Sequence, residues 1–157
     1  MMLKTLSAVI LSAGLTLSLP ALADGFAAVF KAKYLPKKLA SISPGKTTKA
    51  EVTKLLGKPL KTENKDTLLF YKTGSLDYDT TIEVKNGKVQ SFYHRIPEGK
   101  VHLKDVQALL PENARKDESE VGHGEGTETQ IEHDGVRLAV KNTKTSPIVS
   151  YFESAKQ

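Results

Sequence analysis

A short pattern occurs twice in the sequence, and its two copies constrain the fold more than any other feature. The copies lie 54 residues apart and share a Gly-Lys pair, an acid-Val pair and a Leu-Leu pair: Gly45-Lys46, Glu51-Val52 and Leu55-Leu56, then Gly99-Lys100, Asp105-Val106 and Leu109-Leu110. The Val and Leu residues stand at helical spacing i, i+3, i+4, which makes one apolar stripe. Helices of about ten residues are unstable alone in water, so each must pack on another apolar surface.

The ends of both expected helices are marked in the sequence. Thr48 and Glu51 form a capping box, in which the hydroxyl and the carboxylate satisfy free N–H groups at a helix start. Gly57 supplies a left-handed residue where this helix ends. The second helix is expected to begin near residues 102–103 and to end before Pro111. A further short helix is indicated by side chains at helical spacing, namely Phe26, Val29, Phe30 and Tyr34.

Two hairpin turns follow the expected helices, at Asn86-Gly87 and Asp134-Gly135. Both dipeptides suit a type I′ turn, which needs positive φ at its two central positions. The expected strands are residues 67–72, 80–85 and 88–96 in the first half, and 128–133, 136–141 and 147–152 in the second. Residues 112–126, acidic and containing three glycines, are expected to form a mobile loop. The fold class is therefore predicted to be α+β, with two tandem units that each combine a helix with a three-stranded antiparallel meander.

A two-residue turn fixes strand register, so the sequence also predicts the faces of each hairpin. The pairs expected on the helix side of the first hairpin are Val84–Val89 and Ile82–Ser91, with Tyr93 beyond. The pairs expected on its solvent side are Lys85–Lys88, Glu83–Gln90, Thr81–Phe92 and Asp79–His94. In the second hairpin, Ile131–Leu138 and Thr129–Val140 lie on one side, and Glu132–Arg137 and Glu128–Lys141 on the other. Cross-strand ion pairs of the latter kind mark the side that faces solvent.

Residues 1–23 have the features of a secretory signal peptide: a short charged start, an apolar run and a small-x-small cleavage pattern. We expect export to the periplasm or the medium after cleavage near Ala23. The mature chain is expected to divide into a first unit, 24–96, and a second, shorter unit, 97–157. No later segment approaches the ~20 apolar residues of a membrane span. The absence of cysteine excludes thiol nucleophiles and thiolate metal sites, and leaves no cysteine for a lipid anchor.

Positive charge is concentrated in the first half of the chain. Residues 24–100 carry a net charge of +7 and residues 101–157 a net charge of −3, and Arg95 is the only arginine in the first of these segments. Nucleic-acid binding relies on arginine forks and stacked aromatic residues. We therefore expect a solvated lysine-rich surface, with electrostatic attraction to acidic partners as the secondary interpretation, and no nucleic-acid partner.

The sequence offers weak candidates for chemistry. Ala40–Thr47 matches a relaxed phosphate-loop pattern, but Pro44 removes an amide and no buried strand precedes it. The four histidines have no spacing that places two imidazoles on one helical face, although a weak metal site around His123 stays open. Asp79 and Glu83 share a strand face without an opposing cleft, and no nucleophile motif is present. We expect no catalytic residue, no cofactor and no metal.

Aromatic side chains on the expected solvent face indicate a protein contact, because interfaces are enriched in Tyr and Phe. Phe92 is the main candidate, since hot spots are few and often aromatic. Two tyrosines in the neighbouring strands and the polar residues beside Phe92 complete the predicted protein-binding set, which is Phe92, Gln90, Glu83, Lys85, Lys88, Tyr71 and Tyr151.

The stretch from Lys38 to Pro59 resembles the helix–Gly–Thr–x–x–x–Val–x–x–x–x–Gly–x–Pro signature of the SmpA/OmlA (BamE-like) envelope proteins. It is also similar to each half of beta-lactamase inhibitor protein, which carries two such units in tandem. The resemblance implies short helices packed on a meander sheet, no catalysis and a role in protein contacts. We therefore expect an exported, non-catalytic protein-binding module that serves as a cell-envelope accessory factor. The alternative is a secreted inhibitor of an extracellular hydrolase.

Overall fold

The computed structural model describes residues 25–120, 127–133, 135–142 and 147–156. The predicted signal peptide, residues 1–23, lies outside the described residues.

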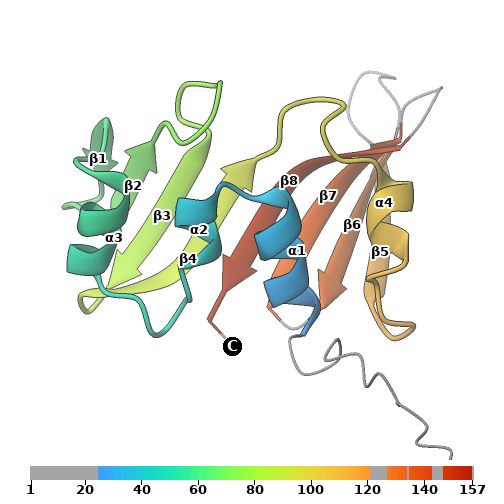
Figure 1. The fold of residues 1–157 in the computed structure, drawn as a ribbon, viewed down its shortest axis with the longest axis horizontal. Helices are drawn as coiled ribbons and strands as arrows, with labels where there is room; N and C mark the ends of the chain where they lie inside the picture. The colour runs from blue at the N-terminus through green and yellow to red at the C-terminus, as the bar shows by residue number, and fades with distance from the viewer. Residues whose placement is uncertain (1–24, 121–126, 134, 143–146, 157) are drawn as a thin grey trace, which may run out of the picture.

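The described strands form a single antiparallel sheet of eight strands in the order β1-β2-β3-β4-β8-β7-β6-β5 (Figure 1). The strands are β1 Lys61–Glu63, β2 Leu68–Tyr71, β3 Thr80–Lys85, β4 Lys88–Arg95, β5 Arg115–Glu120, β6 Thr127–His133, β7 Val136–Asn142 and β8 Ile148–Ala155. The helices are α1 Phe26–Tyr34, α2 Lys37–Ala40, α3 Lys49–Leu56 and α4 Leu103–Gln107. The four described helices lie on one face of the sheet, and no described helix covers the opposite face, hereafter the helix-free face (Figure 1).

The joint between β4 and β8 corrects the predicted fold class. Two separate three-stranded meanders were expected, but β8 pairs along β4, with Ser91 opposite Ala155 and Arg95 opposite Tyr151. An unpaired edge on β4 would expose a row of backbone N–H and C=O groups. The last strand of the chain fills that edge, so the strands of both chain halves form one continuous sheet instead of two tandem units.

Three phenylalanines form the core beneath this joint. Phe30 of α1 stacks on Phe152 of β8 with ring centroids 5.2 Å apart, and Phe92 of β4 lies 5.6 Å from Phe152. All three side chains are fully buried. The predicted N-terminal helix is therefore confirmed, and its apolar side covers the seam between the two halves of the sheet.

The predicted capping box of α3 is confirmed. The Thr48 hydroxyl accepts a hydrogen bond from the Glu51 amide, and the Glu51 carboxylate accepts one from the Thr48 amide at 2.7 Å. The helix of the second copy, α4, is shorter than expected and ends at Gln107. Val106 is buried in the same way as Val52 of α3, so both copies contribute a valine to the core.

Part of the expected mobile loop at 112–126 is a strand. β5 pairs with β6, with Arg115 opposite Glu132 and Asp117 opposite Gln130. Charged side chains suit an edge strand, because they keep its free edge solvated and discourage pairing with another chain. Residues 121–126 of that segment lie outside the described residues. Among the described residues, no helix has the length and apolar character needed to cross a membrane.

A β-bulge changes the faces of the first hairpin. Lys85 lies opposite Lys88 and Val84 opposite Val89, as predicted, but the register then shifts by one residue between Glu83 and Val84. The true partners beyond the shift are Glu83–Ser91, Ile82–Phe92, Thr81–Tyr93 and Thr80–His94. One extra residue in a strand moves every following side chain to the other face. The predictions that Ser91 lies opposite Ile82 and that Phe92 faces solvent are therefore wrong.

Candidate functional site

Two residues of the predicted binding set are buried in the core. Phe92 is 1% exposed and Tyr71 is 2% exposed, so neither side chain reaches the surface of the folded chain. Phe92 turns inward because of the bulge, where it meets Phe152. Tyr71 belongs to β2, in which Leu69 and Tyr71 point into the core and the alternate residues point outward.

The other five residues of the set remain at the surface. Glu83, Lys85 and Lys88 are exposed, and Gln90 and Tyr151 are half-buried. Strand alternation places Tyr151 on the helix-free face, because its neighbour Phe152 packs against the helix α1. Of the predicted set, Tyr151 is the aromatic residue that keeps a surface position.

Tyr151 has an aromatic partner that the sequence prediction placed in the core. The rings of Tyr93 and Tyr151 lie with centroids 5.0 Å apart and planes tilted by 39°. Tyr93 pairs with Glu153 and Arg95 pairs with Tyr151 across β4 and β8, so the two tyrosines are diagonal neighbours on one face. Burial raises the pKa of each phenol, Tyr93 and Tyr151, above the ordinary value for tyrosine. Both hydroxyls are therefore protonated at neutral pH and available as hydrogen-bond donors.

The tyrosine pair lies in a hollow of about 500 Å³ on the helix-free face. Residues of both chain halves line it: Leu76, Tyr93, Arg95, Ile96, Pro97, Glu98, Glu128, Lys141, Ser150 and Tyr151. Arg95 and Lys141 contribute positive charge, and Glu98 and Glu128 contribute negative charge. The hollow thus combines an aromatic floor with charged groups of both signs, and it exists only because β4 and β8 are neighbours.

A chain of ion pairs crosses three strands of this face. The Arg137 guanidinium donates to Glu132 at 3.0 Å and to Glu153 at 3.3 Å. The pKa of Arg137 is raised, chiefly by its hydrogen bond to Glu132. The predicted Glu132–Arg137 pair and the Glu128–Lys141 register are confirmed. These contacts hold β6, β7 and β8 side chains in place next to the tyrosine pair.

Asp79 and His94 belong to a buried hydrogen-bond network and not to a solvent face. The Asp79 carboxylate accepts hydrogen bonds from the Thr73 amide at 2.7 Å and the Gly74 amide at 2.5 Å. The Thr80 hydroxyl lies 2.9 Å from Nδ1 of His94. Burial is the main reason that the pKa of His94 is lowered. This network fixes the β2–β3 loop to the sheet, which is a structural role, and its groups are closed to a substrate.

The relaxed phosphate-loop pattern does not form a phosphate cradle. Such a cradle needs several backbone N–H groups that point at the ligand. Here the amide of Gly45 donates to the Val89 carbonyl at 2.7 Å, and the amides of Lys46 and Thr47 donate to the Ser43 carbonyl. Three consecutive amides are already engaged by protein oxygens.

Within the part of the chain that the structure describes, no group of three or more His, Asp or Glu residues could hold a metal ion. His123, the residue around which a weak metal site was considered, lies outside those residues.

The sequence prediction missed Tyr93, Arg95 and the loop that follows, although a signal was present. Phe92 and Ile96 are four residues apart, so a regular strand puts both on one face. Val89 and Phe92 are three residues apart, so a regular strand would put them on opposite faces. They share a face only if a bulge, with one extra residue, interrupts the strand between them. The buried Val89, Phe92 and Ile96 of the structure show that this happens. The odd spacing of apolar residues was thus the signature of the bulge.

Comparison with known proteins gives a fold and corrects the predicted family. No protein-family model and no curated protein matches the chain. The fold is similar to the crystal structure of a DUF4309 family protein, YjgB, from Bacillus subtilis, with a TM-score of 0.52, 14% identity, and coverage of 86% of this chain and 96% of that chain. At this identity the likeness shows the fold alone. The resemblance to SmpA/OmlA envelope proteins and to beta-lactamase inhibitor protein was therefore misleading, and the fold shown is one shared with YjgB.

Proposed function

We propose that this chain is an exported, non-catalytic protein-binding module that contacts its partner through the helix-free face of the sheet. The observation that carries the proposal is the Tyr93–Tyr151 pair, half-buried in a hollow on that face. Tyrosine is enriched at interfaces because it offers a large rigid ring and a hydroxyl that donates hydrogen bonds. Residues of this kind, set in a hollow, are the usual anchors of a protein contact.

The surroundings of the pair favour a polypeptide as the ligand. Arg95, Glu98, Glu128 and Lys141 line the hollow and supply charges of both signs. A polypeptide presents apolar groups, hydrogen-bond acceptors and charges of both signs together, so it can match such a surface. An aromatic centre within a polar rim is also the usual anatomy of a protein interface.

A binding role suits the chemistry of the hollow better than catalysis does. Its tyrosines are neutral phenols whose pKa is raised by burial, so they are poor bases and poor nucleophiles at neutral pH. The described groups with a nucleophile-like arrangement, Thr80 and His94, are fully buried. The proposed module therefore acts by contact.

Export is proposed from the signal-like residues 1–23. Of the two roles considered from the sequence, an accessory factor at the cell envelope is the better proposal. The segment Gly25–Leu60, which carries α1, α2 and α3, has a net charge of +7. A basic layer on the face opposite the hollow suits a module that works beside an anionic surface.

Site-specific photo-cross-linking in the exporting cell tests the proposal. A photoreactive phenylalanine analogue replaces Tyr151 in one variant and the exposed Ala28 of α1 in a matched control. We expect a discrete protein adduct, identified by mass spectrometry, from position 151 and a much weaker one from position 28. A folded, exported variant that gives no discrete adduct from position 151, or gives it only from position 28, would overturn the proposal.

A further inference from the structure

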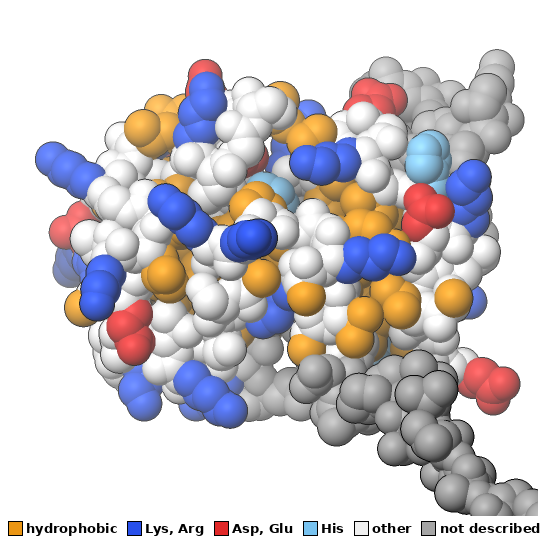
Figure 2. Space-filling model, in the orientation of Figure 1, with side chains coloured by type: hydrophobic (Ala, Val, Ile, Leu, Met, Phe, Trp, Pro, Cys, Tyr) orange, Lys and Arg blue, Asp and Glu red, His pale blue; other side chains and the backbone are white. Residues whose placement is uncertain are grey.

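The first helical layer of the molecule carries a large excess of positive charge. Residues Gly25–Leu60 contain eight lysines and one glutamate, without arginine or aspartate. These residues form α1, α2 and α3, all on the same face of the sheet. Figure 2 shows Lys and Arg side chains spread across this face, with fewer acidic side chains among them. Lysines that are scattered along the sequence are thus collected on one side of the fold.

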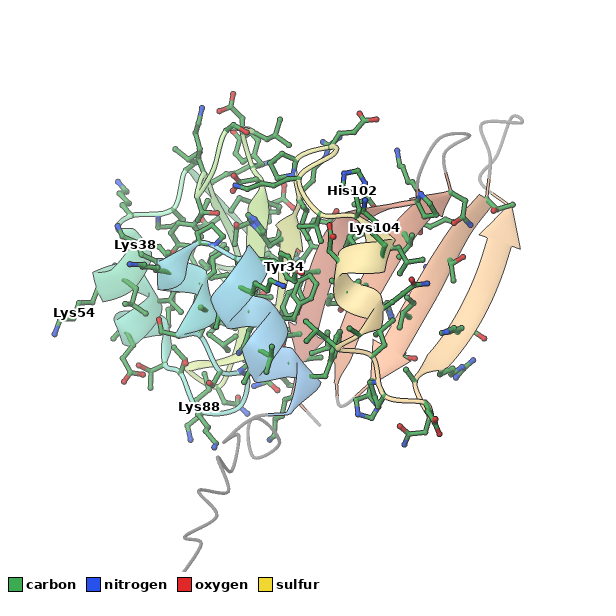
Figure 3. All side chains as sticks on the ribbon, turned by 45° about the vertical axis from the view of Figure 1, so that its right-hand side comes forward. Tyr34, Lys38, Lys54, Lys88, His102 and Lys104 are labelled. Carbon is green, nitrogen blue, oxygen red and sulfur yellow. The ribbon has the colours of Figure 1, made fainter. Side chains whose placement is uncertain are left out.

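Most of these lysines are exposed, and Lys33 also lies over the Tyr34 ring, with its Nζ 5.1 Å from the ring centroid. The exposed ones are Lys33, Lys37, Lys38, Lys46, Lys54 and Lys58. Two others have structural contacts: Lys31 is buried and donates to the Ile42 carbonyl, and Lys49 donates to the Asp66 carbonyl. In Figure 3, Lys38, Lys54 and Lys104 project from three different helices, α2, α3 and α4. The positive surface therefore extends beyond the first three helices.

The single acidic residue of the segment does little to balance this charge. The Glu51 carboxylate accepts hydrogen bonds from the Thr48 amide and hydroxyl at 2.7 and 2.9 Å. The pKa of Glu51 is lowered, first by its hydrogen bond to the Thr48 backbone. Its negative charge therefore lies at the N-terminus of α3, which is the positive end of the helix dipole.

The opposite face of the sheet has charges of both signs, several of them paired. Arg137 contacts two carboxylates, Glu132 and Glu153, and Lys61 lies in contact with Glu63. The asymmetry between the faces means that the net positive charge of the molecule is displayed mainly by the helix layer.

The composition of the helix layer favours a lipid surface over nucleic acid. It has no arginine to form bidentate phosphate contacts. Its aromatic rings are not available for base stacking. Phe26 and Phe30 are buried, and the half-buried Tyr34 is held by a hydrogen bond from its hydroxyl to the Asp105 carbonyl. Apart from Lys33, the exposed side chains of α1 are small and apolar, namely Ala28 and Ala32. A broad array of lysines suits the diffuse negative charge of a bilayer surface.

We propose that the helix layer, defined by α1, α2 and α3, docks electrostatically on an anionic lipid bilayer. This leaves the hollow with Tyr93 and Tyr151 facing away from the bilayer, where it can bind a protein. The docking surface does not depend on the proposed protein contact, since no helix-layer lysine lines that hollow.

Vesicle co-sedimentation of the protein purified from the exported fraction tests the proposal. The vesicles contain phosphatidylcholine with about 30 mol% phosphatidylglycerol, or phosphatidylcholine alone, at low and high salt. One variant combines Lys33→Gln, Lys38→Gln and Lys54→Gln. The matched control combines Lys61→Gln, Lys85→Gln and Arg115→Gln, three exposed residues of the sheet that change the net charge equally. Circular dichroism confirms that both variants remain folded.

We expect binding to the anionic vesicles at low salt and little binding to phosphatidylcholine alone. Near 1 M salt the binding should be lost, because the Debye length is then only ~3 Å. Each lysine that reaches the membrane surface contributes a factor of about five. The helix-layer variant should therefore bind at least about tenfold more weakly than wild type, while the control stays within about threefold.

Three results would overturn the proposal. The first is no binding of wild type to the anionic vesicles at low salt. The second is an equal loss in both variants, which would mean that total charge and not the helix layer determines binding. The third is binding of polyglutamate without binding of vesicles, abolished by the helix-layer substitutions, which would assign this surface to an acidic protein.

Discussion

Tyr34 of α1 donates a hydrogen bond from its hydroxyl to the backbone carbonyl of Asp105 in α4, at 2.9 Å. The two residues lie 71 positions apart in the chain, and Figure 3 shows Tyr34 pointing from α1 toward α4. This bond connects the N-terminal helix to the helix of the second copy. Together with the packing of Phe30 on Phe152, it fastens α1 across both halves of the molecule.

Removal of the Tyr34 hydroxyl tests this connection. Tyr34→Phe keeps the ring, which lies 4.9 Å from that of Phe30, and loses only the hydrogen bond. We expect the free energy of unfolding to fall by about 0.5–1.5 kcal/mol, as measured by urea denaturation. The control is Tyr78→Phe, because Tyr78 is 51% exposed and its hydroxyl should contribute little. An equal effect of both substitutions would contradict a specific role for the α1–α4 bond.

The bulge in the first hairpin predicts that substitutions of two adjacent aromatic residues lower stability by unequal amounts. Phe92→Ala truncates a core side chain and should lower the free energy of unfolding by about 3–5 kcal/mol. Tyr93→Ala removes a half-buried surface ring and should cost much less. Chemical denaturation of both variants gives the comparison. If Tyr93→Ala destabilised the protein more than Phe92→Ala, the two faces would be exchanged and the hollow would not exist as described.

The buried His94 should make stability sensitive to mild acid. Burial lowers its pKa in the folded state and the nearby Lys100 acts in the same direction, whereas Asp79 partly opposes them. The unfolded state has an ordinary histidine pKa of about 6.5, so it binds more protons than the folded state below that pH. Stability should therefore fall as the pH drops below about 6.5 and level out once the pH is below the folded-state pKa.

Thermal unfolding of wild type and His94→Asn over this pH range measures the effect. The variant is expected to be less stable near neutral pH, because the contact with the Thr80 hydroxyl is changed, but to have a flatter pH dependence between neutral pH and the folded-state pKa. Equal slopes for the two proteins would show that His94 does not carry the acid sensitivity.

Much of the local structure was predictable from the sequence. The Asn86-Gly87 turn and the Thr48–Glu51 capping box depend on neighbouring residues alone, and both are present in the structure. The second hairpin has the predicted register, including Glu132 opposite Arg137. In these cases the conformation is set by φ preferences and by side chain–backbone bonds within a few residues.

The predictions that were wrong concern features that depend on distant parts of the chain. The pairing of β4 with β8 joins residues about 60 positions apart, and no local pattern specifies it. The bulge is favoured because it turns Phe92 toward Phe152, a partner that is present only after β8 has docked. Tyr93 and Tyr151 meet as a consequence of both events, so the candidate site could not be assembled from either hairpin alone.

The central claim, that the helix-free face binds a protein through its tyrosine pair, is tested most directly by affinity. The polypeptide cross-linked at position 151 is purified, and its dissociation constant is measured by isothermal titration calorimetry with wild type, Tyr93→Ala and Tyr151→Ala. The control is Leu60→Ala, which removes an exposed apolar side chain that does not line the hollow. Each tyrosine substitution is expected to weaken binding by about tenfold to a hundredfold, the range of an aromatic hot spot, while Leu60→Ala binds as wild type does. Unchanged affinity in both folded tyrosine variants would contradict the claim.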